Sequence, residues 1–130
     1  MAELNVGDQV PELSVTPDKY LPHRYAGASG DFNPIHIDDE FAKAVGLPRN
    51  ILHGLYSMGL VAKANAALAG GDPRALKRLA VQFRGMGMPE QEIVVSGTVK
   101  AVDGDTVVVD TVARQGGTEI IKNAEAEVQL

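Results

Sequence analysis

The sequence has no cysteine and no tryptophan, and only 5% of its residues are aromatic. Without cysteine the chain can form no disulfide, no thiolate nucleophile and no cysteine-ligated zinc site. It also has no N-terminal signal pattern and no apolar run long enough to cross a bilayer. We therefore expect a cytoplasmic protein that does not enter membranes.

The chain also lacks an excess of positive charge. Lys and Arg number 12 against 17 Asp and Glu, which gives a formal net charge of −5 at pH 7. A mildly acidic chain has no positive field for phosphate backbones, so we do not expect it to bind nucleic acid. The basic residues are scattered along the sequence except for one group, formed by Arg74, Lys77, Arg78 and Arg84.

The length of 130 residues suits one domain with a real core and is too short for two ordinary domains. The composition is that of a globular protein, with 45% hydrophobic residues. There is no internal repeat, linker or low-complexity tract. We expect residues 1–130 to form a single domain.

The most informative segment runs from Tyr25 to Asp38, with the sequence YAGASGDFNPIHID. It sets Asp31 and His36 around a glycine and a proline that restrict the backbone, so both side chains are held on a constrained loop. A carboxylate and an imidazole that converge on one water can transfer protons near neutral pH. Alternatively, Asp31 is a turn or helix-capping residue and His36 a hydrogen-bonded loop histidine.

A second candidate feature is the expected start of a helix at Gly54. The first N–H groups of a helix lack internal partners and carry the positive end of the helix dipole, so they can hold developing negative charge. Gly54 would let a substrate oxygen approach closely, and Ser57 could add a hydroxyl donor on the same face. The alternative is that Gly54 only permits tight packing and that Ser57 bonds back to the helix.

These segments, together with Gly46-Leu-Pro and the run LHGLYSMG at residues 52–59, resemble the hydratase signature of one family. It is the MaoC-like family of (R)-specific enoyl-thioester hydratases and dehydratases. The likeness is greatest to the B-type subunit of bacterial (3R)-hydroxyacyl-acyl-carrier-protein dehydratases. It covers about residues 20–60, and the strand-rich remainder fits the family's hot-dog fold.

The resemblance implies a reversible addition of water across a trans-2-enoyl thioester to give a (3R)-hydroxyacyl thioester in fatty acid metabolism. Asp31 and His36 would hold the water, and Gly54 and Ser57 would form an oxyanion hole. The resemblance implies no cofactor beyond the carrier of the substrate, either coenzyme A or the phosphopantetheine of an acyl carrier protein. We expect the rest of the loop to be structural, through Ser29, Gly30, Asn33 and Pro34.

The family forms dimers with a tunnel at the interface, so a homodimer is expected. A heterodimer with a related hot-dog subunit that lacks the acid–base pair is the alternative. The group Arg74, Lys77, Arg78 and Arg84 could meet the phosphates of coenzyme A or the acidic face of a carrier protein. It could equally be a solvated basic face.

Other chemistry fits the sequence less well. His36 with Asp38 and Asp39 does not build a convincing metal site, so no metal is expected. We expect His53 to order the start of the helix and His23 to lie on a helix surface, neither of them catalytic. Ser57 lacks the spacing of a nucleophilic serine elbow. Two rivals remain, an acyl-thioesterase and a non-catalytic acyl-binding or dimerisation subunit on the same fold.

The predicted fold is α+β, with an antiparallel sheet wrapped around a long central helix. Period-two alternation predicts the strands and apolar patterning the helices. The first helix starts at the cap Asp18 or at Pro22, and Phe41, Ala44 and Val45 are expected to form the apolar face of the second. The expected strands are 9–15, 79–84, 93–102, 106–114 and 119–130, and the expected helices are 18–27, 38–46 and a buried 54–69.

Overall fold

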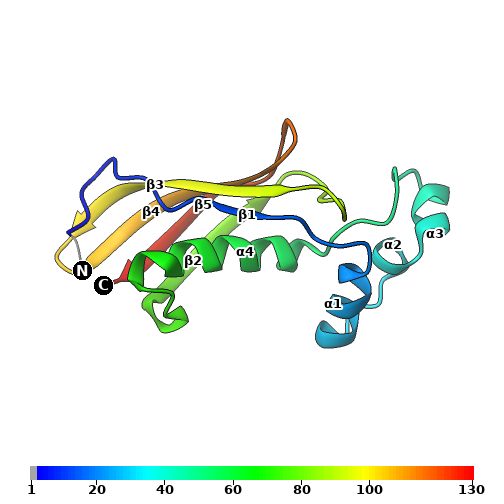
Figure 1. Cartoon of the computed structure of the whole chain (residues 1–130), viewed down its shortest axis with the longest axis horizontal. Coiled ribbons are helices and arrows are strands. Elements are labelled where there is room, and N and C mark those ends of the chain that lie inside the picture. Colours follow the sequence, from blue (N-terminus) through cyan, green and yellow to red (C-terminus); the bar gives the residue numbers. More distant parts are fainter. Residues whose placement is uncertain (1–2) are drawn as a thin grey trace.

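A curved five-stranded antiparallel sheet covers one long helix in the computed structural model, which describes residues 3–130 (Figure 1). The predicted α+β hot-dog architecture is confirmed. The strands are β1 (Leu13–Val15), β2 (Leu76–Phe83), β3 (Ile93–Asp103), β4 (Thr106–Gln115) and β5 (Thr118–Gln129). The helices are α1 (Leu21–Ser29), α2 (Pro34–Ile37), α3 (Asp39–Ala44) and α4 (Gly54–Ala66), with 3₁₀ turns at Ala67–Ala69 and Pro73–Ala75.

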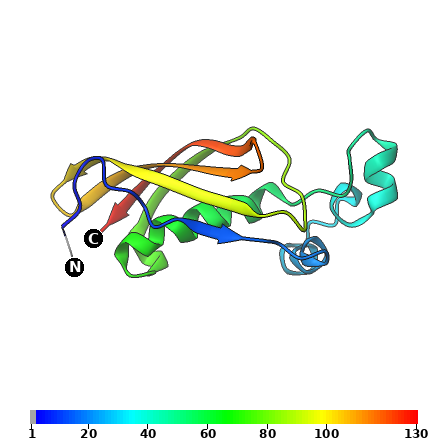
Figure 2. The same ribbon diagram turned by 45° about the horizontal axis from the view of Figure 1, so that its top comes forward.

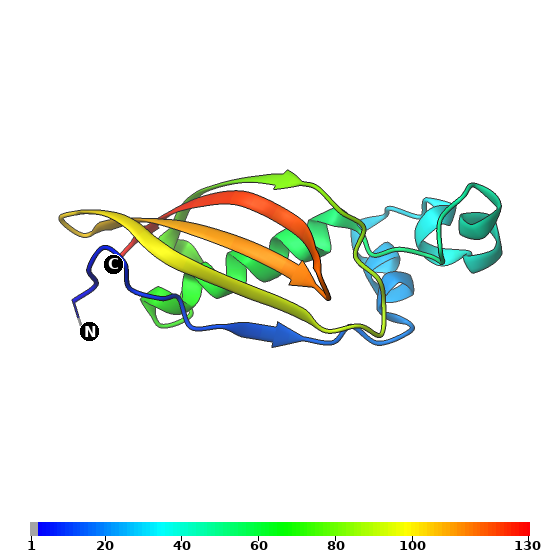
Figure 3. The same cartoon turned by 90° about the horizontal axis from the view of Figure 1, so that it is seen from above.

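The strand order is β1-β3-β4-β5-β2, so β1 and β2 form the two edges of the sheet (Figure 3). Strands β3, β4 and β5 follow one another through tight turns in which Gly104 and Gly116 have φ angles of 58° and 59°. Glycine adopts this left-handed backbone without steric cost. The predicted alternation on the last strand is confirmed, because Ala124, Ala126 and Val128 are fully buried.

The core lies between the concave face of the sheet and α4. Burial of each large aliphatic side chain there stabilises the fold by roughly 1.5–3 kcal/mol. One polar link crosses this core: the Asn65 amide on α4 donates to the carbonyl of Val61 and to the hydroxyl of Thr111 on β4. The largest fully buried aliphatic side chains are Val61, Ile93, Val95, Val99, Val107, Val109, Ile120, Ile121 and Val128.

The apolar sequence of α4 predicted a helix buried on all sides. The structure shows that one side of it is exposed. The side that faces the sheet carries Leu60, Val61 and Ala64, all buried, whereas Leu55 on the opposite side is 63% exposed. An apolar groove of about 420 Å³ runs along that uncovered side, between the helix and the start of β2. A helix without a wide polar face therefore has one face that nothing in residues 3–130 covers.

The first strand is shorter than predicted. Gln9 forms an isolated bridge with Thr98, and the regular strand begins only at Leu13. Pro11 lies between them and has no N–H to donate, which explains the interruption. The N-terminal segment nevertheless lies against β3, because the Val10 N–H donates to the Gly97 carbonyl at 2.8 Å.

Helix α1 begins at Leu21, between the two predicted starts. Asp18 does cap the preceding turn, since its Oδ1 accepts from the Tyr20 N–H at 2.8 Å, but Tyr20 holds the N-cap position. Pro22 falls in the first helical turn, where a missing N–H costs no hydrogen bond.

Helices α1, α2 and α3 form a helical lobe, residues 21–44, that projects beyond one end of the sheet (Figure 2). Helix α2 is a single turn that the sequence analysis missed. Asn33 caps it and Pro34 occupies its first turn, a pairing that favours helix starts.

The predicted apolar face of α3 is wrong. Phe41 and Val45 are exposed and Ala42 is the buried residue. Because the helix has six residues, its packing partners rather than its own pattern decide which side is buried.

No helix in residues 3–130 combines the length and the apolar character needed to cross a bilayer.

Candidate active site

Asp31 and His36 face each other across a gap of one water molecule. Asp31 Oδ2 and His36 Nε2 lie 3.9 Å apart, too far for a direct hydrogen bond. Two hydrogen bonds of about 2.8 Å to one oxygen span this distance comfortably. The side chain of Asp31 is 54% exposed and that of His36 is 10% exposed, so the pair is reached by solvent from the aspartate side.

Short side-chain contacts fix the loop that carries Asp31. The Asp31 N–H donates to Ser29 Oγ at 3.1 Å, and Asp31 Oδ1 accepts from the Asn33 N–H at 3.2 Å. Gly30 has a φ angle of 80°, which a residue with a side chain rarely adopts. One carboxylate oxygen therefore makes the turn, while Oδ2 stays free toward His36. The turn and the acid–base interpretations of Asp31 are compatible.

The contacts of His36 determine which ring nitrogen is free. Its Nδ1 lies 2.8 Å from the Ile51 carbonyl, which only accepts, so Nδ1 carries the hydrogen. The lone pair is then on Nε2, the atom that faces Asp31. Asn50, which is buried, donates its side-chain N–H to the His36 carbonyl at 2.9 Å and fixes the backbone of the residue.

Asp39 supports this arrangement from α3. Its carboxylate accepts from the Asn50 N–H at 3.0 Å and pairs with Lys43. The Lys43 ammonium and the Asn50 N–H hold the pKa of Asp39 below its usual range. A carboxyl with a lowered pKa stabilises the folded state above its unfolded pKa, and the contribution is lost as the pH falls through the lowered value. At neutral pH the support of the loop is fully present.

A pocket of about 300 Å³ opens beside the pair, at the start of α4. Gly54, the predicted oxyanion donor, lines this pocket, and a Cβ built on Gly54 would lie 3.2 Å from the ring of Phe83. Ser57 is buried and is not among the residues that line the pocket. The lining residues are Tyr25, Ser29, Asp31, His53, Gly54, Leu55 and Phe83.

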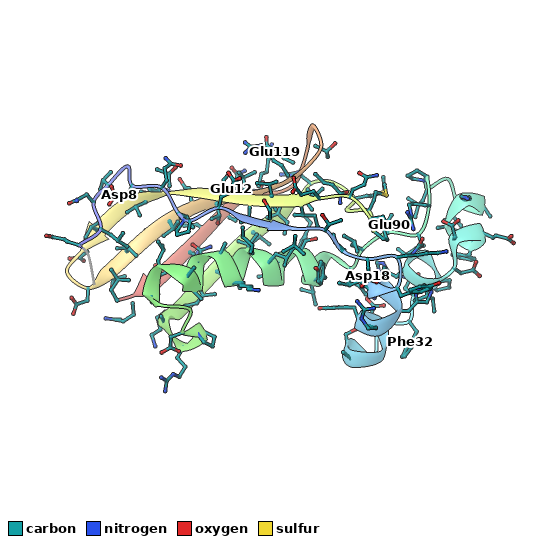
Figure 4. All side chains as sticks on the ribbon, viewed as in Figure 1. Asp8, Glu12, Asp18, Phe32, Glu90 and Glu119 are labelled. Carbon is teal, nitrogen blue, oxygen red and sulfur yellow. The ribbon has the colours of Figure 1, made fainter. Side chains whose placement is uncertain are left out.

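Tyr25, Leu55 and Phe83 are lining residues that the sequence analysis did not propose. Phe83 is 51% exposed although it is a large apolar residue. It is the last residue of β2, which forms one edge of the sheet. A second exposed aromatic residue, Phe32, follows Asp31 in the helical lobe (Figure 4).

His53 lies closer to the pair than expected. It occupies the N-cap position of α4 but makes no side-chain capping bond, so it does not order the helix start in the predicted way. Its ring stacks on that of His36, with centroids 3.9 Å apart and planes at 20°. The other predicted non-catalytic histidine, His23, is exposed on α1 and bonds to the Ile37 carbonyl at 3.0 Å.

The sequence analysis considered His36, Asp38 and Asp39 as a possible metal site. Both aspartates are engaged elsewhere in the structure. Asp38 caps α3 by accepting from the Phe41 N–H, and Asp39 is engaged with Asn50 and Lys43. A different trio, Asp31, His36 and His53, brings one potential ligand atom each within 4.8 Å of the others. Stacked rings direct their nitrogen lone pairs along nearly parallel planes rather than toward one point, which is unsuited to tetrahedral coordination.

The four predicted carrier-binding residues are spread along β2. Arg74 precedes the strand and pairs with Asp72, and Arg78 pairs with Glu125 on β5. Lys77 is exposed beside Arg78. Arg84 donates to the Gln82 side chain. It directly follows Phe83, which lines the pocket, so it is the member of this group that is adjacent in the chain to a pocket residue.

Comparison with known proteins supplies a family context for this geometry. A family model described as "MaoC like domain" matches residues 5–123. A relative named "Enoyl-CoA hydratase 2, peroxisomal", from Arabidopsis thaliana, is 40% identical over 86 residues, or 65% of this chain. The chain spans only 27% of the length of that relative.

Solved structures share the whole fold. A structure titled "MaoC-like dehydratase" superposes with a TM-score of 0.92 and 34% identity, over 98% of this chain and 41% of the other. A structure of the ChsH1-ChsH2 complex from Mycobacterium tuberculosis has a TM-score of 0.87 and 25% identity, over 98% of this chain and 99% of the other. The similarity therefore extends through the sheet, the central helix and the lobe that carries Asp31 and His36.

Proposed function

Because the chain belongs to the MaoC-like domain family, we propose that it is an (R)-specific hydro-lyase. It adds water reversibly across a trans-2-enoyl thioester and gives a (3R)-hydroxyacyl thioester. The observation that carries the proposal is the gap of 3.9 Å between Asp31 Oδ2 and His36 Nε2, beside the pocket at the start of α4. Two proton acceptors face one water position there.

The water gives its oxygen to C3 of the substrate and one proton to the Asp31–His36 pair. The π electrons of the double bond move toward the thioester carbonyl, and its oxygen gains negative charge. In this proposal the Gly54 N–H, which lies at the positive end of α4, stabilises that charge. The pair then returns one proton to C2, so the enzyme ends the cycle in its starting protonation state.

The proposal is tested by mixing the purified protein with crotonyl-CoA and following the loss of enoyl-thioester absorbance, with chiral analysis of the product. The expected product is (R)-3-hydroxybutyryl-CoA. Release of free thiol would identify a thioesterase instead. If the folded protein does not act on crotonyl-CoA, the same assay with crotonyl-acyl carrier protein decides between a different carrier and a non-catalytic acyl-binding subunit.

The substrate carrier is coenzyme A or an acyl carrier protein, and we propose that Arg84 contacts its phosphate. Arg78 lies about 20 Å from Arg84 along an extended strand, so it serves as a matched control. We expect Arg84→Glu to raise the KM for crotonyl-CoA roughly three- to tenfold at low salt and Arg78→Glu to leave it unchanged. An unchanged KM in both variants would show that neither residue binds the carrier.

We further propose that the protein works as a dimer in the cytoplasm, in fatty acid metabolism. The uncovered face of α4 and the free edge of β2 support a dimer, because an unpaired strand edge and an apolar helix face both favour association. A homodimer has about twice the monomer mass of 13.8 kDa by light scattering. A mass equal to that of one chain would instead favour pairing with a related hot-dog subunit.

A further inference from the structure

His53 contacts both members of the acid–base pair. Its Nε2 lies 3.0 Å from the main-chain carbonyl of Asp31, and its ring stacks on that of His36. It also contacts Tyr25 of α1, with ring centroids 4.6 Å apart. Three separate segments, namely α1, the loop before α2 and α2 itself, therefore meet on the side chain of one residue.

The hydrogen bond to Asp31 determines the tautomer of the neutral His53 ring. A carbonyl oxygen only accepts, so Nε2 carries the hydrogen and Nδ1 carries the lone pair. Nδ1 is one of two buried side-chain polar atoms in residues 3–130 that have no hydrogen-bond partner, and the residue is 2% exposed. This tautomer leaves an acceptor unpaired, whereas the other tautomer would bury an unpaired N–H and lose the bond to Asp31.

His53 is also joined directly to the proposed oxyanion donor. The Gly54 nitrogen is bonded to the His53 carbonyl carbon in a planar peptide, so the position of His53 limits the position of the Gly54 N–H. A residue with an unsatisfied buried nitrogen and no capping bond contributes little to helix stability by itself. Its contacts are instead directed at the groups that would react.

We propose that His53 is a positioning residue, which holds the Asp31–His36 loop at a fixed distance from the Gly54 N–H. This inference rests on the proposed hydratase function. The Nε2–H to Asp31 bond holds the backbone that carries the carboxylate, and the stacked ring restricts the plane of the His36 imidazole. The three groups that handle the proton and the oxyanion then keep one arrangement through the reaction.

The test compares His53→Met with His53→Gln. Methionine fills the space without a donor, whereas the glutamine amide reaches the position of Nε2 and can still donate to the Asp31 carbonyl. A displacement of about 1 Å at reacting groups costs on the order of 10²-fold in rate. We expect kcat to fall roughly 10- to 100-fold in His53→Met, with KM within about threefold, and to recover at least about fivefold in His53→Gln.

His23→Met is the matched control, because His23 donates to a main-chain carbonyl of the same lobe, that of Ile37, and within residues 3–130 forms no side-chain hydrogen bond or ring stacking with Asp31 or His36. Its kcat is expected to equal that of the wild type. Thermal unfolding of all three variants separates positioning from folding. If His53→Met and His53→Gln lose the same activity, or lose it in proportion to their melting temperatures, His53 is structural and the proposal is wrong.

A second measurement does not depend on activity. Nitrogen-15 chemical shifts of the imidazole rings distinguish the two neutral tautomers, and the signals of His53 are identified by their loss in His53→Gln. We expect His53 with its hydrogen on Nε2 and His36 with its hydrogen on Nδ1. The opposite tautomer of His53 would overturn the positioning role even in an active enzyme. An inactive wild type with the expected tautomers would overturn the hydratase function alone.

Discussion

Replacement of Asp31 by Asn is expected to reduce the kcat for crotonyl-CoA hydration by about 10²–10⁴-fold without unfolding the protein. The amide keeps an oxygen at the position of Oδ1, so the turn bond from the Asn33 N–H is retained. It cannot take a proton from water, because an amide has no acid–base chemistry near neutral pH. The measurement is steady-state hydration at saturating substrate, with circular dichroism as the control for folding.

His36→Gln is expected to lose activity to a similar extent. Glutamine also loses the bond from Nδ1 to the Ile51 carbonyl, so a cost of about 1 kcal/mol in stability accompanies the loss. His36→Asn separates the two effects, since its amide nitrogen falls near Nδ1 and can donate to Ile51 but cannot act as a base. The three variants should be comparably inactive and differ in melting temperature.

The double variant Asp31→Asn/His36→Gln should be no less active than the worse single variant, because the pair acts as a unit on one water. Multiplicative losses would mean that the two residues act independently. If either single variant kept more than about a tenth of the wild-type kcat, the acid–base role proposed for that residue would be wrong.

The largest expected effect on stability is that of Gly97→Ala on β3. A Cβ at this position would lie 2.5 Å from Thr111 Cγ2, 2.7 Å from the Asp110 carbonyl oxygen and 3.1 Å from Val10 Cγ2. The methyl group of Thr111 could turn away, but the Asp110 carbonyl belongs to the paired strand β4 and cannot move without breaking the sheet register. The added methyl group therefore has no space on either side.

We expect Gly97→Ala to lower the free energy of unfolding by about 3 kcal/mol, which corresponds to a fall in melting temperature of roughly 10 °C. Gly27→Ala in α1 is the control, because a Cβ there meets nothing within 4 Å. In a helix that substitution stabilises by up to about 1 kcal/mol. Equal melting temperatures for the two variants would show that the approach of Val10 and β4 to Gly97 is looser than the structure indicates.

The proximity of Asp31 and His36 could be predicted from the sequence because their spacing and their backbone are local. Gly30 and Pro34 restrict the backbone between Ser29 and His36, so two side chains five positions apart in the chain face each other in space. The contacts of His53 could not be predicted in this way. Its place before α4 was clear, but the direction of its ring depends on Asp31 and His36, which a sequence does not orient.

The basic residues illustrate the opposite limit. Arg74, Arg78 and Arg84 are close in the sequence, but an extended strand separates them by about 3.3 Å per residue. Basic residues that are near one another in the sequence therefore lie far apart along a strand, whereas a helix would bring several of them onto one face. The long strands could be predicted because alternation persists over many residues, whereas the six residues of α3 carry too little pattern to decide its buried side.

The helical lobe packs chiefly on itself and on the segments that lead into and out of it, while the sheet and α4 share the hydrophobic core. Segments with few buried apolar contacts open at lower free energy than the core, so the lobe is expected to detach at urea concentrations that leave β3, β4 and β5 paired. Asp31 and His36 would leave the start of α4 in that state. Loss of catalysis would then precede the main unfolding transition.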